Sequence, residues 1–157
     1  MAVIVTENGS GLASANSYVS EADCTFYATD RGASISGVVA DLLIKAMDYI
    51  ESNNFIGRKK TMSQALQWPR YDVVIDGFYP ESTEIPLLLK DALCEVVIGI
   101  DGGTNPLANV PRETVKEKVD VIEVEYSASA RPQTYLLAAE TKLKKITKSN
   151  QSRAIRG

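Results

Sequence analysis

The amino-acid sequence predicts a mainly α fold: a small bundle of about four helices with a short β-hairpin or strand element and extended termini. Four segments carry helix signals, and one later segment alternates apolar and polar residues as a strand does. The chain has 157 residues, of which 45% are hydrophobic and 24% are charged, and this composition supports one globular core. We therefore expect a single helical domain over residues 1–148, with its β element at 115–126, followed by an extended basic tail at 149–157.

The first two helices are predicted from capping residues and apolar spacing. Ser20 begins a pattern that resembles a capping box, and Gly32 suits a C-terminal cap, so we expect a helix at about 21–31. A second helix is expected from about 37 to 52, after a Ser36 cap. Its apolar residues are spaced three and four apart and form one stripe: Val39, Leu42, Leu43, Ala46, Met47 and Ile50.

The segment between the second and third helices is predicted to consist of loops with short local structure. Residues 63–67 are expected to form one short helical turn, which the Trp-Pro pair at 68–69 ends because the residue before a proline avoids the α region. The Asp-Gly pair at 76–77 is the turn signal of a small hairpin or ordered loop.

The last two helices differ in how much of their surface is apolar. Pro86 stands at the first position of the third helix, which is expected to run to about Ile100 and is apolar almost all round. Such a helix is typical of the centre of a bundle. The fourth, at about 133–147, has one narrow apolar seam that is expected to pack on a single neighbour: Leu136, Ala139, Leu143 and Ile146.

Residues 115–126 are predicted to be β structure because apolar and acidic residues alternate along them. The pattern fits one long strand, and it also fits a hairpin that turns near Asp120. In either arrangement one face of the later part carries three apolar or aromatic residues: Ile122, Val124 and Tyr126.

Residues that commonly carry catalytic or metal chemistry are sparse. The sequence has no histidine, and its two cysteines, Cys24 and Cys94, are far apart in the chain. We therefore expect no enzyme activity, no cofactor and no metal site. The cysteines are interpreted as small buried hydrophobes in a reducing compartment, with a single disulfide as the alternative. Asp72 and Asp76 lack the loop pattern of a calcium site and are interpreted as turn formers.

The composition also argues against several classes of protein. The net charge of −3 disfavours a nucleic-acid binder that is basic overall. No apolar run approaches the roughly 18–20 residues that span a bilayer. The first residues lack the basic and apolar regions of a signal peptide, so we expect neither secretion nor membrane insertion.

Charge is divided unevenly along the chain. The first 140 residues carry 11 basic and 20 acidic side chains, a net charge of −9, whereas the last 17 carry +6. The basic terminus is either a solvated tail or a segment that docks on an acidic surface while the acidic body repels polyanions. Its cations are Lys142, Lys144, Lys145, Lys148, Arg153 and Arg156.

A second basic feature is the triplet Arg58, Lys59 and Lys60. With Phe55 and Trp68 nearby in the sequence, it could form a small platform for single-stranded nucleic acid, because such sites combine aromatic stacking with cations that contact phosphates. Trp68 is better interpreted as a core anchor, since aromatic residues make up only 7% of the chain.

Short motifs follow one another along nearly the whole chain, each weak alone but specific in their order. They are Val3-Ile-Val5, Ala15-Asn-Ser-Tyr-Val-Ser20, Ala46-Met-Asp-Tyr-Ile50, Gly57-Arg-Lys59, Gln64-Ala-Leu-Gln-Trp-Pro-Arg70, Ile85-Pro86, Lys90-Asp-Ala-Leu-Cys-Glu95, Glu117-Lys-Val119 and Ile122-Glu-Val-Glu-Tyr126. In this order they resemble a family of tailed-bacteriophage head–tail connector proteins, also called adaptor or head-completion proteins. Members of that family often carry the label "DnaT-like single-stranded-DNA-binding".

The resemblance implies a structural virion protein at the neck, beneath the portal vertex, that is present in the host cytoplasm during assembly. It would form a dodecameric ring that docks under the portal protein, contacts a downstream neck or tail-completion protein, and lets DNA pass through its bore without sequence-specific binding. We then expect portal docking by Lys142, Lys145, Lys148, Arg153, Ile155 and Arg156. We expect strand pairing between subunits by Ile122, Val124 and Tyr126.

The alternative interpretation is a single-stranded-DNA-binding replication accessory protein. It depends on the family label and on the basic triplet at 58–60. The two interpretations predict different salt dependence, because a true DNA binder loses affinity steeply as salt rises, whereas an adaptor has little affinity at any salt.

Overall fold

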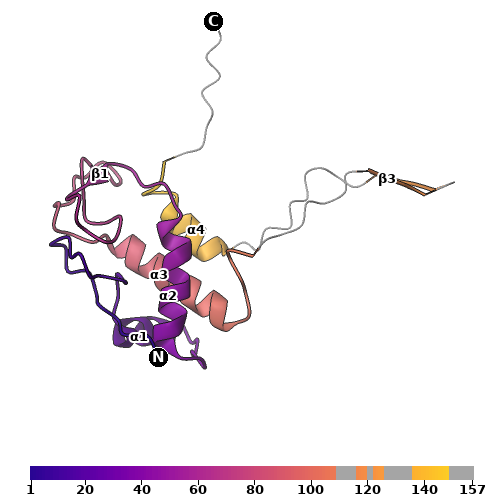
Figure 1. The fold of residues 1–157 in the computed structure, drawn as a ribbon, viewed down its shortest axis with the longest axis horizontal. Helices are drawn as coiled ribbons and strands as arrows, with labels where there is room; N and C mark the ends of the chain where they lie inside the picture. Colours follow the sequence, from indigo (N-terminus) through magenta and orange to yellow (C-terminus); the bar gives the residue numbers. More distant parts are fainter. Residues whose placement is uncertain (109–115, 120–121, 126–135, 149–157) are drawn as a thin grey trace, which may run out of the picture.

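A computed structural model describes residues 1–108, 116–119, 122–125 and 136–148 (Figure 1). The predicted mainly α fold is confirmed. The helices are α1 (Glu21–Asp30), α2 (Val39–Glu51), α3 (Leu87–Asp101) and α4 (Leu137–Leu143). The strands are β1 (Arg58–Lys59), β2 (Arg70–Tyr71), β3 (Lys116–Val119) and β4 (Ile122–Glu125), and they form two separate antiparallel pairs, β1–β2 and β3–β4.

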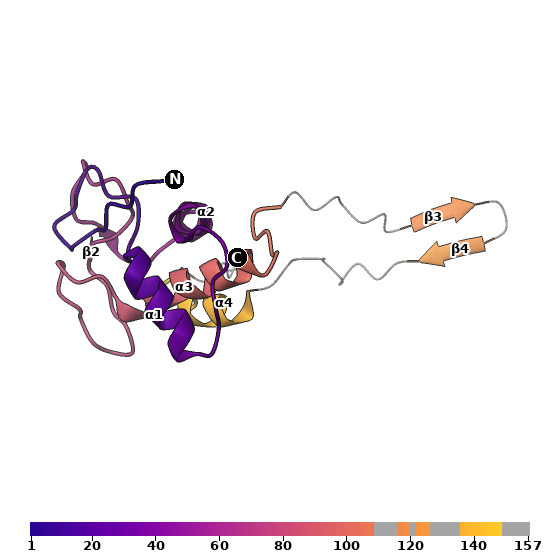
Figure 2. The same cartoon turned by 90° about the horizontal axis from the view of Figure 1, so that it is seen from below.

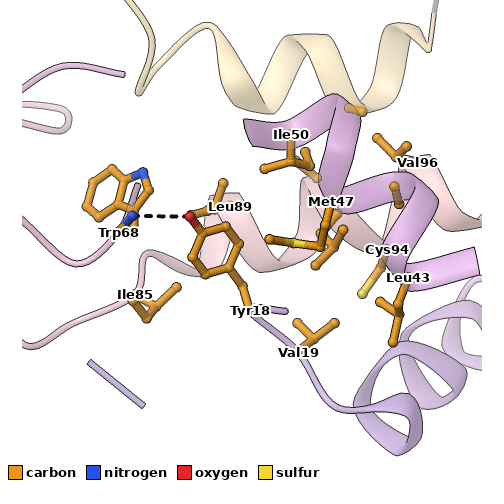
Figure 3. Packing of buried hydrophobic residues seen from close by; sticks show 14 of the residues in the cluster. Tyr18, Val19, Leu43, Met47, Ile50, Trp68, Ile85, Leu89, Cys94 and Val96 are labelled. Atoms are coloured by element: carbon orange, nitrogen blue, oxygen red, sulfur yellow. Dashed lines mark hydrogen bonds between the residues drawn. The ribbon is translucent and has the colours of Figure 1, made fainter. Parts of the chain in front are cut away.

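Helix α3 lies at the centre of the bundle, as its apolar composition predicts. It contacts α1, α2 and α4 (Figure 1). Six of its residues are buried: Leu89, Ala92, Leu93, Cys94, Val96 and Val97. The apolar stripe of α2 packs against it, with Leu43, Met47 and Ile50 meeting Leu89 and Val96 in the core (Figure 3). Burying each such side chain contributes about 1.5–3 kcal/mol, so this contact is a major source of the bundle's stability. Of the helices in the described ranges, none is long and apolar enough to cross a bilayer.

Helix α1 begins where its capping residue predicts. The Ser20 hydroxyl accepts the Asp23 N–H at 3.1 Å, and Gly32 follows the helix with a positive φ of 70°. The helix buries Cys24 and Ala28 against the bundle. Cys24 and Cys94 are both free and buried, which confirms their interpretation as small core residues.

Ser36 does not cap α2, so that prediction is wrong. The N-cap position is Val38, which has no side-chain capping bond. The Ser36 and Gly37 N–H groups instead donate to the Asp101 carboxylate at 2.9 and 2.8 Å, and these two bonds lower the pKa of Asp101. The carboxylate at the end of α3 therefore fixes the entry to α2.

The predicted helical turn at 63–67 is also wrong, because those residues form bends. The buried Gln64 amide accepts the Thr61 N–H at 2.8 Å and donates to the carbonyls of Leu66 and Pro69 at 2.8 and 3.1 Å. The N–H groups of Ala65 and Gln67 donate outside the segment, to the Leu12 carbonyl at 3.0 Å and the Glu51 carboxylate at 2.9 Å, so they do not close a local helical turn. The Asp-Gly turn at 76–77 is confirmed, since Ile75 and Phe78 exchange both backbone hydrogen bonds at 2.9 Å.

Helix α4 is shorter than predicted but buries the predicted seam. Ala139, Leu143 and Ile146 are buried, and α3 is the helix that α4 contacts within the described part of the chain. Beyond the helix, the chain pairs with the segment before β1. The Ile56 N–H donates to the Ile146 carbonyl at 3.0 Å, and the Lys148 N–H donates to the Asn54 carbonyl at 2.8 Å.

The β element at 115–126 is a hairpin, which decides between the two arrangements that the sequence left open. Strands β3 and β4 run antiparallel, with Lys116 opposite Glu125 and Lys118 opposite Glu123 (Figure 2). Pairing opposite charges across strands favours this register. As far as the described residues show, neither strand contacts a helix. Tyr126 and the tail at 149–157 lie outside the described residues.

A buried hydrogen-bond network joins α2 to the loop that follows it. The Tyr18 hydroxyl donates to the Glu51 carboxylate and accepts the Trp68 N–H at 3.1 Å (Figure 3). The other Glu51 oxygen accepts the Gln67 N–H at 2.9 Å. Burial is the main cause that raises the pKa values of both Glu51 and Tyr18. The network fixes residues 67 and 68 against the helical core.

Replacing Tyr18 by phenylalanine is expected to lower the free energy of unfolding by about 1–3 kcal/mol, because the Trp68 N–H and a Glu51 oxygen lose their partner while buried. Urea denaturation followed by tryptophan fluorescence measures the change. Tyr79→Phe is the matched control, since the Tyr79 side chain is exposed. Equal stability of the two variants would show that the Tyr18 hydroxyl is not needed to hold this loop.

Candidate nucleic-acid interface

The basic triplet lies on the short β1–β2 ladder. Arg58 is paired with Tyr71 and Lys59 with Arg70, and the Lys60 N–H extends the ladder by donating to the Pro69 carbonyl at 3.1 Å. Arg58 and Lys59 are exposed, whereas Lys60 is half-buried. The ladder therefore presents two of the three predicted cations to solvent.

Each cation of the triplet has a partner within the protein. Arg58 forms an ion pair with Asp72, with 2.7 Å between Nε and Oδ2. The Lys59 and Lys60 ammonium groups donate to the carbonyls of Gln64 and Gly9 at 3.3 and 3.2 Å. A lysine ammonium has three donors, so both lysines keep donors for a further acceptor.

The aromatic half of the predicted platform is wrong. Phe55 and Trp68 are fully buried and pack edge to face, with ring centroids 6.0 Å apart and an interplanar angle of 78°. Neither ring is accessible for stacking on a base. Trp68 is a core anchor, as the sequence favours.

Three other aromatic side chains are exposed on β2 and on the segment that follows it. Phe78 and Tyr79 are 77% and 79% exposed, and Tyr71 is 39% exposed. The Arg58 guanidinium lies 5.6 Å from the centre of the Tyr71 ring, within the range of a cation–π contact. Sequence reasoning missed these rings. For Phe78 and Tyr79 the available signal is the neighbouring Asp-Gly turn, because the tip of a tight turn faces solvent.

The C-terminal part of the described chain brings further cations to the same region. Lys145 pairs with Asp76 at 2.9 Å, in the turn that Phe78 closes, and the Lys148 N–H donates to the Asn54 carbonyl at 2.8 Å. Lys142 is directed elsewhere, because its ammonium lies 3.5 Å from the Glu95 carboxylate on α3. Arg153, Ile155 and Arg156 lie outside the described residues.

We call this region the basic–aromatic surface. It consists of Arg58, Tyr71, Phe78, Tyr79 and Lys145; Lys59 is left out because adjacent strand residues face opposite sides and Lys59 is paired with the buried Arg70.

A buried arginine holds the ladder that supports the surface. The Arg70 guanidinium donates to the carbonyls of Ile56, Gly57 and Gln67 at 2.7, 2.9 and 3.2 Å. Burial lowers the pKa of Arg70, and the nearby Tyr18 and Glu51 oppose that effect. By binding carbonyls on both sides of the ladder, Arg70 sets the spacing of β1 and β2.

A family model described as "Putative DnaT-like ssDNA binding protein" matches residues 1–157. The chain belongs to this family. No curated protein and no solved structure matches it significantly. Membership in the DnaT-like family agrees with the label that the sequence motifs imply, while the head–tail connector assignment stays a proposal.

Gly57→Ala is expected to disrupt the ladder. Gly57 has a φ of 71°, and an added Cβ would lie 2.3 Å from the Tyr71 carbonyl oxygen. Gly77→Ala is the matched control, because Gly77 also has a positive φ, 86°, but no atom lies within 4 Å of its added Cβ. The control should cost roughly 1–3 kcal/mol of unfolding free energy for its backbone conformation alone. Gly57→Ala should cost clearly more in thermal or urea denaturation; equal costs would contradict the close approach.

Proposed function

We propose that the chain binds single-stranded DNA through the basic–aromatic surface. The observation that carries the proposal is the exposure of three rings near cations: Tyr71 lies against Arg58, and Phe78 and Tyr79 follow Asp76, the partner of Lys145, by two and three residues. Single-strand binding sites combine cations that contact the backbone with aromatic rings on which bases stack. The DnaT-like family match supports the same chemistry.

The position of the surface fits the charge of the whole chain. The first 140 residues carry a net charge of −9, so most of the body repels a polyanion. A DNA strand would approach the protein where its cations are exposed, at Arg58 on the β1–β2 ladder and at Lys145 after α4. Because phosphates are contacted by few cations, the affinity should be moderate and should fall as salt rises.

Phe78→Ala and Tyr79→Ala are each expected to weaken binding of a labelled oligo(dT), because each removes a ring on which a base can stack. Loss of one stacking contact costs about 1–3 kcal/mol, a weakening of roughly fivefold or more. Fluorescence anisotropy at several salt concentrations measures the affinity. Phe26→Ala on α1 is the matched control, since its ring is 68% exposed but lies outside the surface. Unchanged affinity in the loop variants, or no binding by the wild-type chain at low salt, would contradict the proposal.

A second candidate function is a head–tail adaptor in a tailed-phage virion. The β3–β4 hairpin favours it, because its strands pair only with each other within the described residues and leave edges free. A hairpin alone is marginally stable, so pairing with a neighbouring subunit would stabilise it. In this proposal the copies form a dodecameric ring at the portal vertex. The contact between subunits is assigned to Ile122, Val124 and Tyr126. Docking on an acidic portal surface is assigned to Lys142, Lys145, Lys148, Arg153, Ile155 and Arg156.

The adaptor proposal predicts near-equal copy numbers of this chain and the portal protein in purified virions, measured by quantitative mass spectrometry. It also predicts that Val124→Pro prevents ring assembly on the portal, because proline removes a strand N–H. Deletion of residues 149–157 tests docking separately and should abolish binding to the portal. Absence of the chain from virions would overturn the proposal.

A further inference from the structure

Two aspartates in an unusual backbone conformation hold cations of the basic–aromatic surface. Among the described residues, the non-glycine positions with positive φ are Asp72 and Asp76, at 57° and 51°. Asp72 pairs with Arg58 at 2.7 Å, and Asp76 pairs with Lys145 at 2.9 Å. The two strained positions are therefore also the two that neutralise this surface.

Turn geometry alone does not require these carboxylates. The left-handed region is unfavourable for most residues, and asparagine enters it at least as readily as aspartate while forming the same turns. Asparagine or glycine would therefore meet the backbone requirement at both positions. What aspartate adds is a negative charge placed against a cation.

The two ion pairs are exposed, so each cation can leave its aspartate for another anionic partner. The Arg58 and Asp72 side chains are 74% and 70% exposed, and those of Lys145 and Asp76 are 51% and 62% exposed. Exposed pairs of this kind are weak and are screened by salt. A backbone phosphate brought close by base stacking could displace either carboxylate.

We infer that Asp72 and Asp76 compete with DNA phosphates for Arg58 and Lys145, and that they thereby limit the affinity for single-stranded DNA. The inference rests on the proposed single-stranded-DNA-binding function. Each carboxylate occupies the position on its cation that a phosphate oxygen would take. The aromatic rings would then supply attraction that the aspartates do not oppose, so the surface would favour unpaired bases over polyanions in general.

The test compares oligo(dT) binding by the full chain with that of Asp72→Asn and Asp76→Asn. Each variant should bind about two- to fivefold more tightly, the range that corresponds to loss of one exposed ion pair. The salt dependence should become steeper by about 0.7 in the logarithmic slope for each cation that is freed to contact a phosphate. Asp72→Gly, which also suits a positive φ, repeats the test if the asparagine variant does not fold.

Two controls separate competition for the cation from a general change in charge. Glu81→Gln removes one negative charge from the same loop, at an exposed residue that forms no ion pair with the described residues. It should change the affinity less than Asp72→Asn does. Asp72→Asn should also tighten binding only while its partner is present, so Arg58→Ala and Arg58→Ala/Asp72→Asn should bind equally.

The outcomes distinguish the inference from the function on which it rests. If the wild-type chain and the asparagine variants all fail to bind at low salt, the proposed function fails and the inference fails with it. If the wild-type chain binds but Asp72→Asn and Asp76→Asn bind no more tightly than Glu81→Gln, the inference alone is overturned. An equal gain from Asp72→Asn in the Arg58→Ala background would overturn it as well.

Discussion

The chain that leaves α2 is fastened to the core by the half-buried Glu51 carboxylate at the end of that helix. Its two oxygens accept hydrogen bonds from Tyr18 and the Gln67 N–H, and its backbone carbonyl accepts the Gln67 side-chain amide at 2.8 Å. Burying a carboxylate is unfavourable, and the raised pKa of Glu51 shows that its partners do not fully offset this cost. These bonds fasten the loop that leads to Trp68 and Arg70 to the end of α2, where little regular structure follows the helix.

From this attachment onward, side chains replace regular secondary structure in binding the backbone. Gln64 and Arg70 together engage the carbonyls of six loop residues: Phe55, Ile56, Gly57, Leu66, Gln67 and Pro69. Glu7 does the same for the N-terminal loop, because its buried carboxylate accepts the N–H groups of Gly9, Gly11 and Leu12 at 2.8–2.9 Å. Buried backbone groups must find partners, and these three polar side chains provide them where no sheet or helix does. The loops on either side of the β1–β2 ladder are therefore ordered, and the ladder places the Tyr71 ring against Arg58.

The sequence predicted what depends on local spacing and missed what depends on distant side chains. The stripe on α2, the apolar α3 and the seam on α4 follow from the period of the helix, and Ser20 caps α1 through a residue three positions away. The Ser36 cap failed because Asp101, 65 residues further on, takes the same N–H groups. The aromatic part of the predicted platform is wrong for the same reason, because Phe55 is buried where it forms a β-bridge with Thr147, 92 residues further on. A contact between residues so far apart has no signature in a local pattern.

The two candidate functions share cations but differ in their need for aromatic rings. Lys145 and Lys148 belong both to the portal-docking residues implied by the sequence motifs and to the region around the basic–aromatic surface, so one copy could not use them for both partners at once. An acidic protein surface would be recognised through charge and would gain little from Phe78 and Tyr79, which stand 77% and 79% exposed. Unpaired bases offer a flat π-face to each ring, and a duplex inside a ring does not, because its bases are already stacked on one another. The cations alone suit either partner. The exposure of these two rings therefore favours single-stranded DNA over an acidic protein surface.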